Sequence, residues 1–162
     1  INHKRIDIQL KAFQKLPSEK LIIVGSYEKT KGFLNYKNYL EKIKPKNVEI
    51  LHWINDKTLV ELYANCKAFI ITSQDEDFGM APLEAMASGK PVIAPNEGGY
   101  KETIINNKTG ILINNINEGK LIKAINHLSP NVKKYKSACL KQAKNFDTKI
   151  FIKKIKQQIK NA

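Results

Sequence analysis

The hydrophobic positions of this chain follow two patterns that alternate along its length. Short apolar runs bounded by glycine, proline or polar residues are typical of strands that are buried on both faces. They lie at 21–24, 48–51, 67–72, 91–94 and 110–113. Segments with apolar residues three and four positions apart predict amphipathic helices between these strands. They lie at 6–16, 33–44, 56–65 and 82–88, with a short helix from Gly98-Gly99 to near Asn106 and helix over the remaining residues.

Strands that alternate with helices predict βαβ units around a parallel sheet. Right-handed crossovers bring the carboxyl ends of all strands to one edge of such a sheet, and ligands bind along that edge. The loops expected there follow Val24, Leu51, Thr72 and Ala94. We therefore expect one α/β domain over 1–162, with helices on both faces of a parallel sheet.

The segment after the strand at 67–72 carries the clearest chemical signal. It has the sequence Glu76-Asp77-Phe78-Gly79-Met80-Ala81-Pro82-Leu83-Glu84. Pro82 fits the first turn of a helix, and Gly89 fits the position just past its end. Free backbone N–H groups near 79–81 would then point out of a helix N-terminus, which suits an anion. Glu84, about one turn into the helix, could accept two hydrogen bonds from a diol such as that of a ribose.

Composition places the chain among globular proteins. Of its 162 residues 42% are hydrophobic and 27% charged, and no apolar run approaches the length of a membrane span. Cys66 and Cys139 are far apart and lack other metal ligands nearby, which indicates two structural thiols in a reducing cytoplasm. Because the chain starts at Ile1 inside what looks like a motif, we expect a piece of a longer protein.

The net charge of +13 has two interpretations. Lysine supplies nearly all of it, and abundant Lys, Ile and Asn together indicate a codon bias. The alternative is attraction to an anionic membrane or nucleic acid. Residues from Pro130 onward hold ten lysines and one acidic residue, with apolar residues at helical spacing. We expect this basic tail to pack on the domain through its apolar stripe, and a membrane-surface helix is the alternative.

Several of these segments together resemble a known family. The runs Thr72-Ser73-Gln74-Asp75-Glu76-Asp77-Phe78-Gly79-Met80 and Pro82-Leu83-Glu84-Ala85-Met86-Ala87-Ser88-Gly89-Lys90-Pro91-Val92 look like the signature of retaining GT-B glycosyltransferases of the group 1 type. Gly98-Gly99-Tyr100-Lys101-Glu102, followed by Asn107-Lys108-Thr109-Gly110-Ile111-Leu112, is similar to the family's second nucleotide-side loop. Lys4, with Asp7, Ala12 and Phe13, is similar to the segment whose lysine reaches the donor phosphates.

The resemblance implies the C-terminal, donor-binding half of a GT-B fold. It covers roughly 1–128, for which it implies a Rossmann-like three-layer core, with C-terminal helices over about 129–162. The N-terminal half, which recognises the acceptor in this family, is absent from the chain. The expected partners are therefore a nucleotide diphosphate sugar, bound as a substrate, and the missing N-terminal half, with peripheral membrane contact open and no nucleic acid expected. No cofactor is implied.

The resemblance also assigns roles to individual residues. Glu84 would bind the ribose hydroxyls. Two residues would act in catalysis: Glu76, next to the donor sugar, and Lys4, at the diphosphate. The other expected donor-binding residues are Phe78, Gly79, Met80, Ala81, Gly98, Gly99, Ile54 and Gly25. No metal site is expected, because the acidic run 75–77 continues into Phe-Gly and so belongs to this loop.

The chain departs from the family at three positions where members usually carry glycine. Arg5, Tyr27 and His52 stand there instead, so the shapes of these loops are open. Trp53 could stack on a base, although packing in the core or against another domain is the expected interpretation.

The expected function follows from the resemblance. The enzyme would transfer a hexose from a nucleotide diphosphate sugar to a glycan or lipid-linked acceptor without a metal. It would work in cell-surface polysaccharide biosynthesis, in the cytoplasm or at the inner membrane face, and the isolated piece would be inactive in transfer. The alternatives are half of a GT-B-like nucleotide-sugar epimerase and a non-catalytic, lysine-rich α/β module that binds nucleic acid.

Overall fold

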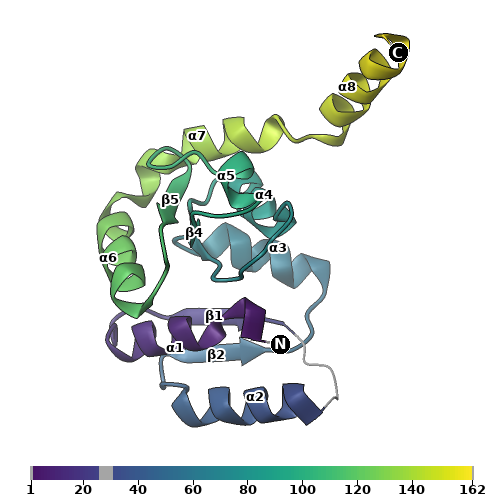
Figure 1. Ribbon diagram of the computed structural model, residues 1–162. Coiled ribbons are helices and arrows are strands. Elements are labelled where there is room, and N and C mark those ends of the chain that lie inside the picture. Colours follow the sequence, from purple (N-terminus) through teal and green to yellow (C-terminus); the bar gives the residue numbers. More distant parts are fainter. Residues whose placement is uncertain (1, 26–30, 162) are drawn as a thin grey trace.

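The computed structural model describes residues 2–25 and 31–161, in which short parallel strands form two sheets. In the first, β1 (Leu21–Val24) pairs with β2 (Val48–Leu51). In the second, β4 (Val92–Pro95) lies between β3 (Phe69–Ile70) and β5 (Gly110–Ile113). All predicted strands are present, with β1, β2, β4 and β5 labelled in Figure 1, and all of the pairing is parallel.

The parallel sheet is divided, which differs from the single sheet expected. Within the described residues β1 and β3 form no ladder with each other. β3 is also shorter than the predicted strand at 67–72, because the chain after Ile71 bonds to the N-terminal segment. Thr72 Oγ1 donates to Lys4 O at 2.8 Å, and Gln74 N donates to His3 O at 2.8 Å. One core of buried apolar side chains nevertheless spans both sheets.

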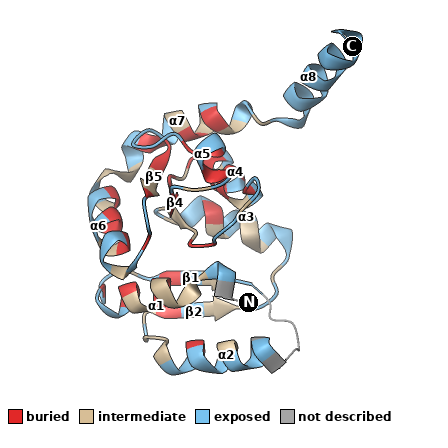
Figure 2. Ribbon diagram, viewed as in Figure 1, coloured by how far each residue is buried: buried red, intermediate tan, exposed pale blue. Residues whose placement is uncertain are grey.

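Helices follow the strands in the order that the sequence predicts (Figure 1). They are α1 (Ile6–Gln14), α2 (Lys31–Ile43), α3 (Asp56–Asn65), α4 (Met80–Ala87), α5 (Tyr100–Thr103), α6 (Glu118–Leu128), α7 (Val132–Lys144) and α8 (Thr148–Asn161), with short 3₁₀ turns at Asn2–Lys4 and Ser129–Asn131. α1 packs on α2 and α6, and α4 packs on α7. Figure 2 shows the buried residues concentrated on α4, α6, β4 and β5.

The helix ends show how local chemistry sets the boundaries. α3 has the predicted bounds. Its cap is Asn55, whose side chain accepts Thr58 N at 2.9 Å, whereas Asp56, the other capping residue type at this end, is already helical. α4 begins at Met80, two residues before the prediction, and Pro82 remains in its first turn. Gly89, with φ +73°, follows the end of α4 as expected.

Helix α5 is shorter than predicted because the chain turns back before Asn106. Thr109 Oγ1 accepts Ile105 N at 2.8 Å, and Asn107 N donates to Gly110 O at 2.7 Å, with Asn107 at φ +62°. These bonds replace a further helical turn and lead the chain directly into β5.

The C-terminal tail divides into two helices with different surroundings. α7 buries Tyr135, Cys139 and Gln142, and Gln142 Nε2 donates to Thr103 O at 3.0 Å. α8 buries none of its described side chains and extends away from the domain (Figure 1). Of the apolar stripe expected to pack on the domain, Phe146, just after α7, packs against the core. The expectation is wrong for α8, where the apolar residues of the stripe are exposed: Ile150, Ile152, Ile155 and Ile159.

Both cysteines are free thiols, as expected of a chain without disulfides. Burial raises the pKa of Cys139 to about 11, and it also raises the pKa of Cys66. Both thiols are therefore protonated at neutral pH, which makes them poor nucleophiles.

Candidate functional site

The site is built where the loops after β3 and β4 meet at the carboxyl edge of the second sheet. Gly99 N donates to Glu76 O at 2.8 Å, which joins the two loops backbone to backbone. A Cβ atom on Gly98 would lie 2.5 Å from Glu76 O, and one on Gly99 would lie 2.4 Å from Asp77 O. Gly98 also has a φ of +49°. Both glycines are therefore required for the backbones of the two loops to come into contact. This structural role is separate from the phosphate contact predicted for them.

The N-terminus of α4 presents unused hydrogen-bond donors beside these loops. The backbone N–H groups of Phe78, Gly79, Met80 and Ala81 have no acceptor among the residues that the structure describes. Gly79 precedes the helix with φ +82°, a conformation that suits glycine. The unsatisfied donors and the positive end of the helix dipole make this terminus a favourable place for an anion.

Lys4 and Glu76 lie together next to this helix terminus. Lys4 Nζ is 3.8 Å from Glu76 Oε2, and the side chains are 52% and 28% exposed. The 3₁₀ turn that carries Lys4 is held to the β3–α4 loop by the bonds from Gln74 and Thr72 described above. The structure thus brings both residues predicted to be catalytic to one place.

Arg5 is the residue that links the three segments of the site. Its Nε donates to Thr72 O at 2.7 Å, and one terminal nitrogen lies 3.4 Å from Ser73 O and 3.3 Å from Glu97 Oε1. The backbone of Arg5 has φ +48°, which is the left-handed conformation. Glycine adopts this conformation most easily, which explains why it is usual at this position in the family that the chain resembles. The sequence marks Arg5 as a departure from the family pattern, but nothing in the sequence indicates that Arg5 joins the ends of β3 and β4.

Glu84 lies one turn into α4 and is held by a residue that sequence analysis missed. The hydroxyl of Tyr63, from α3, donates to Glu84 Oε2 at 3.0 Å. Tyr63 is buried and Glu84 is exposed. Burial, followed by the charge of Glu84 and the hydrogen bond to it, raises the pKa of Tyr63. The only sign of Tyr63 in the sequence is its position four residues after Leu59 in the predicted helix, which places it on the same, inward face.

Tyr100 lies under the site and carries an unpaired hydroxyl. The residue is fully buried, and its ring is the nearest contact that a Cβ atom on Gly79 would make, at 3.3 Å. The hydroxyl approaches the Ser73 side chain but makes no hydrogen bond of satisfactory geometry among the described residues. Burial raises the pKa of Tyr100 to about 12, so this tyrosine is a neutral part of the floor.

Two predicted binding residues follow the strands of the first sheet and, in the described chain, are not bonded to this cluster. Gly25 and Ile54 follow β1 and β2 at the carboxyl ends of these strands, as expected. No hydrogen bond or ion pair among the described residues links them to residues 76–84. Trp53, next to Ile54, is 82% exposed, so it does not pack in the core, and its packing against another domain stays a prediction. Tyr27 lies outside the described residues.

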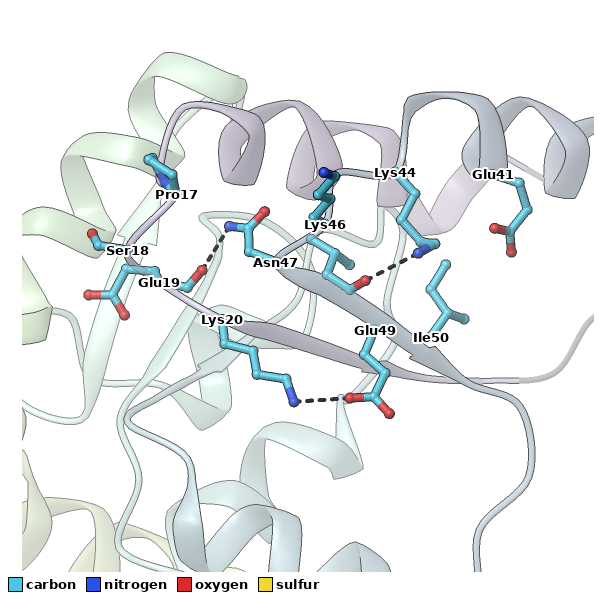
Figure 3. A pocket seen from close by; sticks show the side chains of 11 residues that line it. Pro17, Ser18, Glu19, Lys20, Glu41, Lys44, Lys46, Asn47, Glu49 and Ile50 are labelled. Atoms are coloured by element: carbon cyan, nitrogen blue, oxygen red, sulfur yellow. Dashed lines mark hydrogen bonds and ion pairs between the residues drawn. The ribbon is translucent and has the colours of Figure 1, made fainter.

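An open cavity of about 590 Å³ lies elsewhere, at the amino ends of β1 and β2 (Figure 3). Four of the six charged residues that line it are already paired through their side chains, Glu19 among them. Lys20 Nζ is 3.0 Å from Glu49 Oε2, and Lys44 Nζ donates to Val48 O at 3.3 Å. Glu19, at one end, accepts hydrogen bonds from Lys67 and Ser129, and chiefly the bond from Lys67 lowers the pKa of Glu19. This hollow therefore offers a ligand few free polar groups.

Two further classes of site are absent from residues 2–25 and 31–161. No group of three or more His, Cys, Asp or Glu side chains is arranged there to hold a metal ion. None of the helices in these ranges combines the length and hydropathy that a membrane span needs.

Comparison with known proteins decides the family. The model of the family "Glycosyl transferases group 1" matches residues 1–146. The chain belongs to the group 1 glycosyltransferases. The glycosyltransferase domain contains both loops, α4 and Lys4, so the whole candidate site falls within the matched region.

Curated glycosyltransferases are similar over part of their length. The alpha-1,3/1,6-mannosyltransferase ALG2 of Dictyostelium discoideum is 38% identical over 102 residues, which are 58% of this chain and 24% of that protein. The trehalose synthase of Pyrococcus horikoshii is 32% identical over 151 residues, 87% of this chain and 36% of that protein. The chain thus spans well under half the length of these relatives.

Solved structures share the fold. Anabaena HepE, solved in complex with UDP, matches with a TM-score of 0.88 at 23% identity, over 100% of this chain and 46% of that one. The sucrose-phosphate synthase of Thermosynechococcus elongatus matches with a TM-score of 0.87 at 21% identity, over 99% and 43%. The expected Rossmann-like C-terminal half of a GT-B glycosyltransferase is confirmed, and the epimerase and nucleic-acid alternatives are not favoured.

Proposed function

We propose that this group 1 glycosyltransferase domain binds a nucleotide diphosphate sugar across the N-terminus of α4. The observation that carries the proposal is the row of unused N–H donors over 78–81, which lies along the chain between Glu76, paired with Lys4, and Glu84. An anion at these donors would have a diol acceptor on one side and a cation on the other. Support also comes from HepE, a structural neighbour that was solved with UDP.

The parts of the donor then take the following places. The diphosphate contacts the N–H groups of residues 78–81 and Lys4, with Gly98 and Gly99 holding the loop beside it. The ribose lies against Glu84, and the sugar lies against Glu76. Gly25 and Ile54, at the ends of β1 and β2, border the nucleoside.

This arrangement supports transfer by stabilising the leaving group. When the bond to the sugar breaks, negative charge grows on the nucleoside diphosphate. The helix N-terminus and Lys4 would stabilise this charge more strongly in the transition state than in the bound donor. Glu76 would exchange its contact with Lys4 for the sugar and orient it. We infer a transfer that uses no metal ion, since these groups supply the positive charge, and the family resemblance leads us to propose that it retains the configuration of the sugar.

The acceptor side would come from the rest of the enzyme. The chain spans 43% of the sucrose-phosphate synthase chain that it matches, so roughly one further half remains to close over the donor. We propose a glycan or lipid-linked acceptor and no transfer by this chain alone. α8 provides the docking surface: its apolar face, with Phe151, Ile155 and Ile159 exposed, would pack on that half. Its lysines would remain outward, toward an anionic cytoplasmic membrane face.

Binding of nucleotides to the purified chain tests the proposal. UDP, GDP, ADP and their glucose and mannose conjugates are added in a thermal-shift panel, with and without EDTA. A ligand at a hundred times its dissociation constant adds about 2.7 kcal/mol to the free energy of unfolding, which such a panel detects readily. We expect one nucleotide diphosphate to stabilise the chain equally in EDTA. Glu84→Ala should weaken that binding, whereas Glu61→Ala, at an exposed glutamate of α3, should not.

Two results would contradict the proposal. If no nucleotide diphosphate stabilises the chain, the donor site is not at this edge. Stabilisation that disappears in EDTA would replace the metal-free mechanism with a metal-dependent one.

A further inference from the structure

The Tyr63–Glu84 contact joins a buried side chain to an exposed one. The ring of Tyr63 packs edge-on against Phe69 of β3, with 5.8 Å between ring centroids and 62° between planes. Its hydroxyl reaches out of the core to Glu84 Oε2 at 3.0 Å. A rigid element of the fold therefore holds a carboxylate that is otherwise in solvent.

This contact limits what the Glu84 carboxylate can do. A free glutamate on a helix surface samples many rotamers, and fixing it on ligand binding costs conformational entropy. Tyr63 already fixes one oxygen, so part of that cost is met before a ligand arrives. Oε1 and the second lone pair of Oε2 remain available as neighbouring acceptors.

The Tyr63 hydroxyl is a dependable donor to this carboxylate. Burial raises the pKa of Tyr63, so the phenol keeps its proton throughout the neutral range. An exposed lysine in its place could rotate away, whereas a buried ring has few alternative rotamers. Glu84 is thereby held in one orientation by a neutral group that does not compete for its charge.

We propose that Tyr63 is a positioning residue that orients Glu84 toward the two hydroxyls of a ribose and so makes the site discriminate ribonucleotides from 2′-deoxyribonucleotides. The inference rests on the proposed function, because it takes Glu84 as the group that contacts the ribose. It adds a residue outside both loops, on α3, to the determinants of donor specificity.

Paired affinities test this role. Dissociation constants are measured by calorimetry for UDP and 2′-deoxy-UDP, and for the GDP and ADP pairs, with the wild-type chain, Tyr63→Phe and Glu84→Ala. We expect the wild type to favour the ribonucleotide, Tyr63→Phe to reduce that preference about three- to tenfold, and Glu84→Ala to remove it. The affinity for the deoxynucleotide should hardly change in Tyr63→Phe. Tyr135→Phe, at another buried tyrosine on α7, should keep the wild-type preference.

The outcomes separate this inference from the proposed function. If the wild type does not distinguish the two sugars, or binds no nucleotide, Glu84 does not contact the ribose and both ideas fail. If the wild type discriminates and Tyr63→Phe discriminates equally, the inference alone is overturned. Equal weakening of both nucleotides in Tyr63→Phe would also overturn it, because that result reports a general structural effect.

Discussion

At the scale of single residues, the glycine pair of the second loop has a stricter role than a turn. Gly98 and Gly99 allow the backbone after β4 to touch the backbone after β3, and no side chain fits between them. The two loops and the adjoining α4 carry most of the candidate donor-binding residues. Their geometry therefore depends on one atom that is missing from each glycine.

Gly99→Ala should disturb both stability and binding. Its Cβ atom would lie 2.4 Å from Asp77 O and 2.5 Å from the Cα of Phe78, so backbone must move. We expect a loss of about 2 kcal/mol in the free energy of unfolding, measured by urea denaturation, together with weaker nucleotide binding. Gly119→Ala is the matched control, since its Cβ atom meets nothing closer than 3.7 Å and alanine favours the helix α6. Unchanged stability and affinity in Gly99→Ala would mean that the loops do not need this contact.

The sequence predicted the residues of the two loops but not those that hold them. Glu76, Gly79, Glu84 and the glycine pair stand in local motifs, so their positions follow from nearest neighbours along the chain. Arg5 and Tyr63 act across 67 and 21 positions of sequence, and no local pattern encodes such a contact. Arg5 nevertheless stands where family members usually carry glycine. Its positive φ explains why glycine is usual at this position.

At the scale of elements, the hydrophobic pattern predicted the type of each helix and strand better than its packing partner. The bounds of β1, β2, α3 and β5 agree with the prediction, and at two of these ends the signal is strong, with Gly25 after β1 and the Asn55 cap before α3. α8 has an equally clear helical pattern, yet it buries nothing within the described structure. Hydrophobic periodicity predicts an amphipathic helix with an apolar face, but it does not identify the part of the protein that packs against that face.

Deleting residues 148–162 tests whether α8 contributes to the stability of this domain. Since none of its described side chains is buried, we expect the free energy of unfolding in urea to change by less than about 0.5 kcal/mol. Tyr135→Ala in α7, which removes a buried ring, should cost about 3 kcal/mol and serves as the contrast. A large loss on deletion would show instead that α8 folds back onto the domain in solution.

At the scale of the whole molecule, charge is the property that distinguishes this chain. It has 28 basic and 15 acidic residues, whereas the ion pairs formed among the described residues are few and mostly exposed. Exposed pairs contribute little to stability, so the excess lysines act mainly through mutual repulsion. The repulsion is strongest in the compact folded state, in which the charges lie closest together.

Salt should therefore stabilise the folded chain. Raising NaCl from about 20 mM to about 300 mM shortens the screening length several-fold and weakens the repulsion among the lysines more than it weakens the few ion pairs. We expect the free energy of unfolding in urea to rise by on the order of 1 kcal/mol. Replacing Lys133, Lys134 and Lys141 on the exposed face of α7 by glutamine removes part of the repulsion in advance, so the triple variant should be more stable at low salt and respond less to NaCl. If stability decreased with added salt in both proteins, the ion pairs would outweigh the net charge, and the lysines would have to be regarded as a stabilising network.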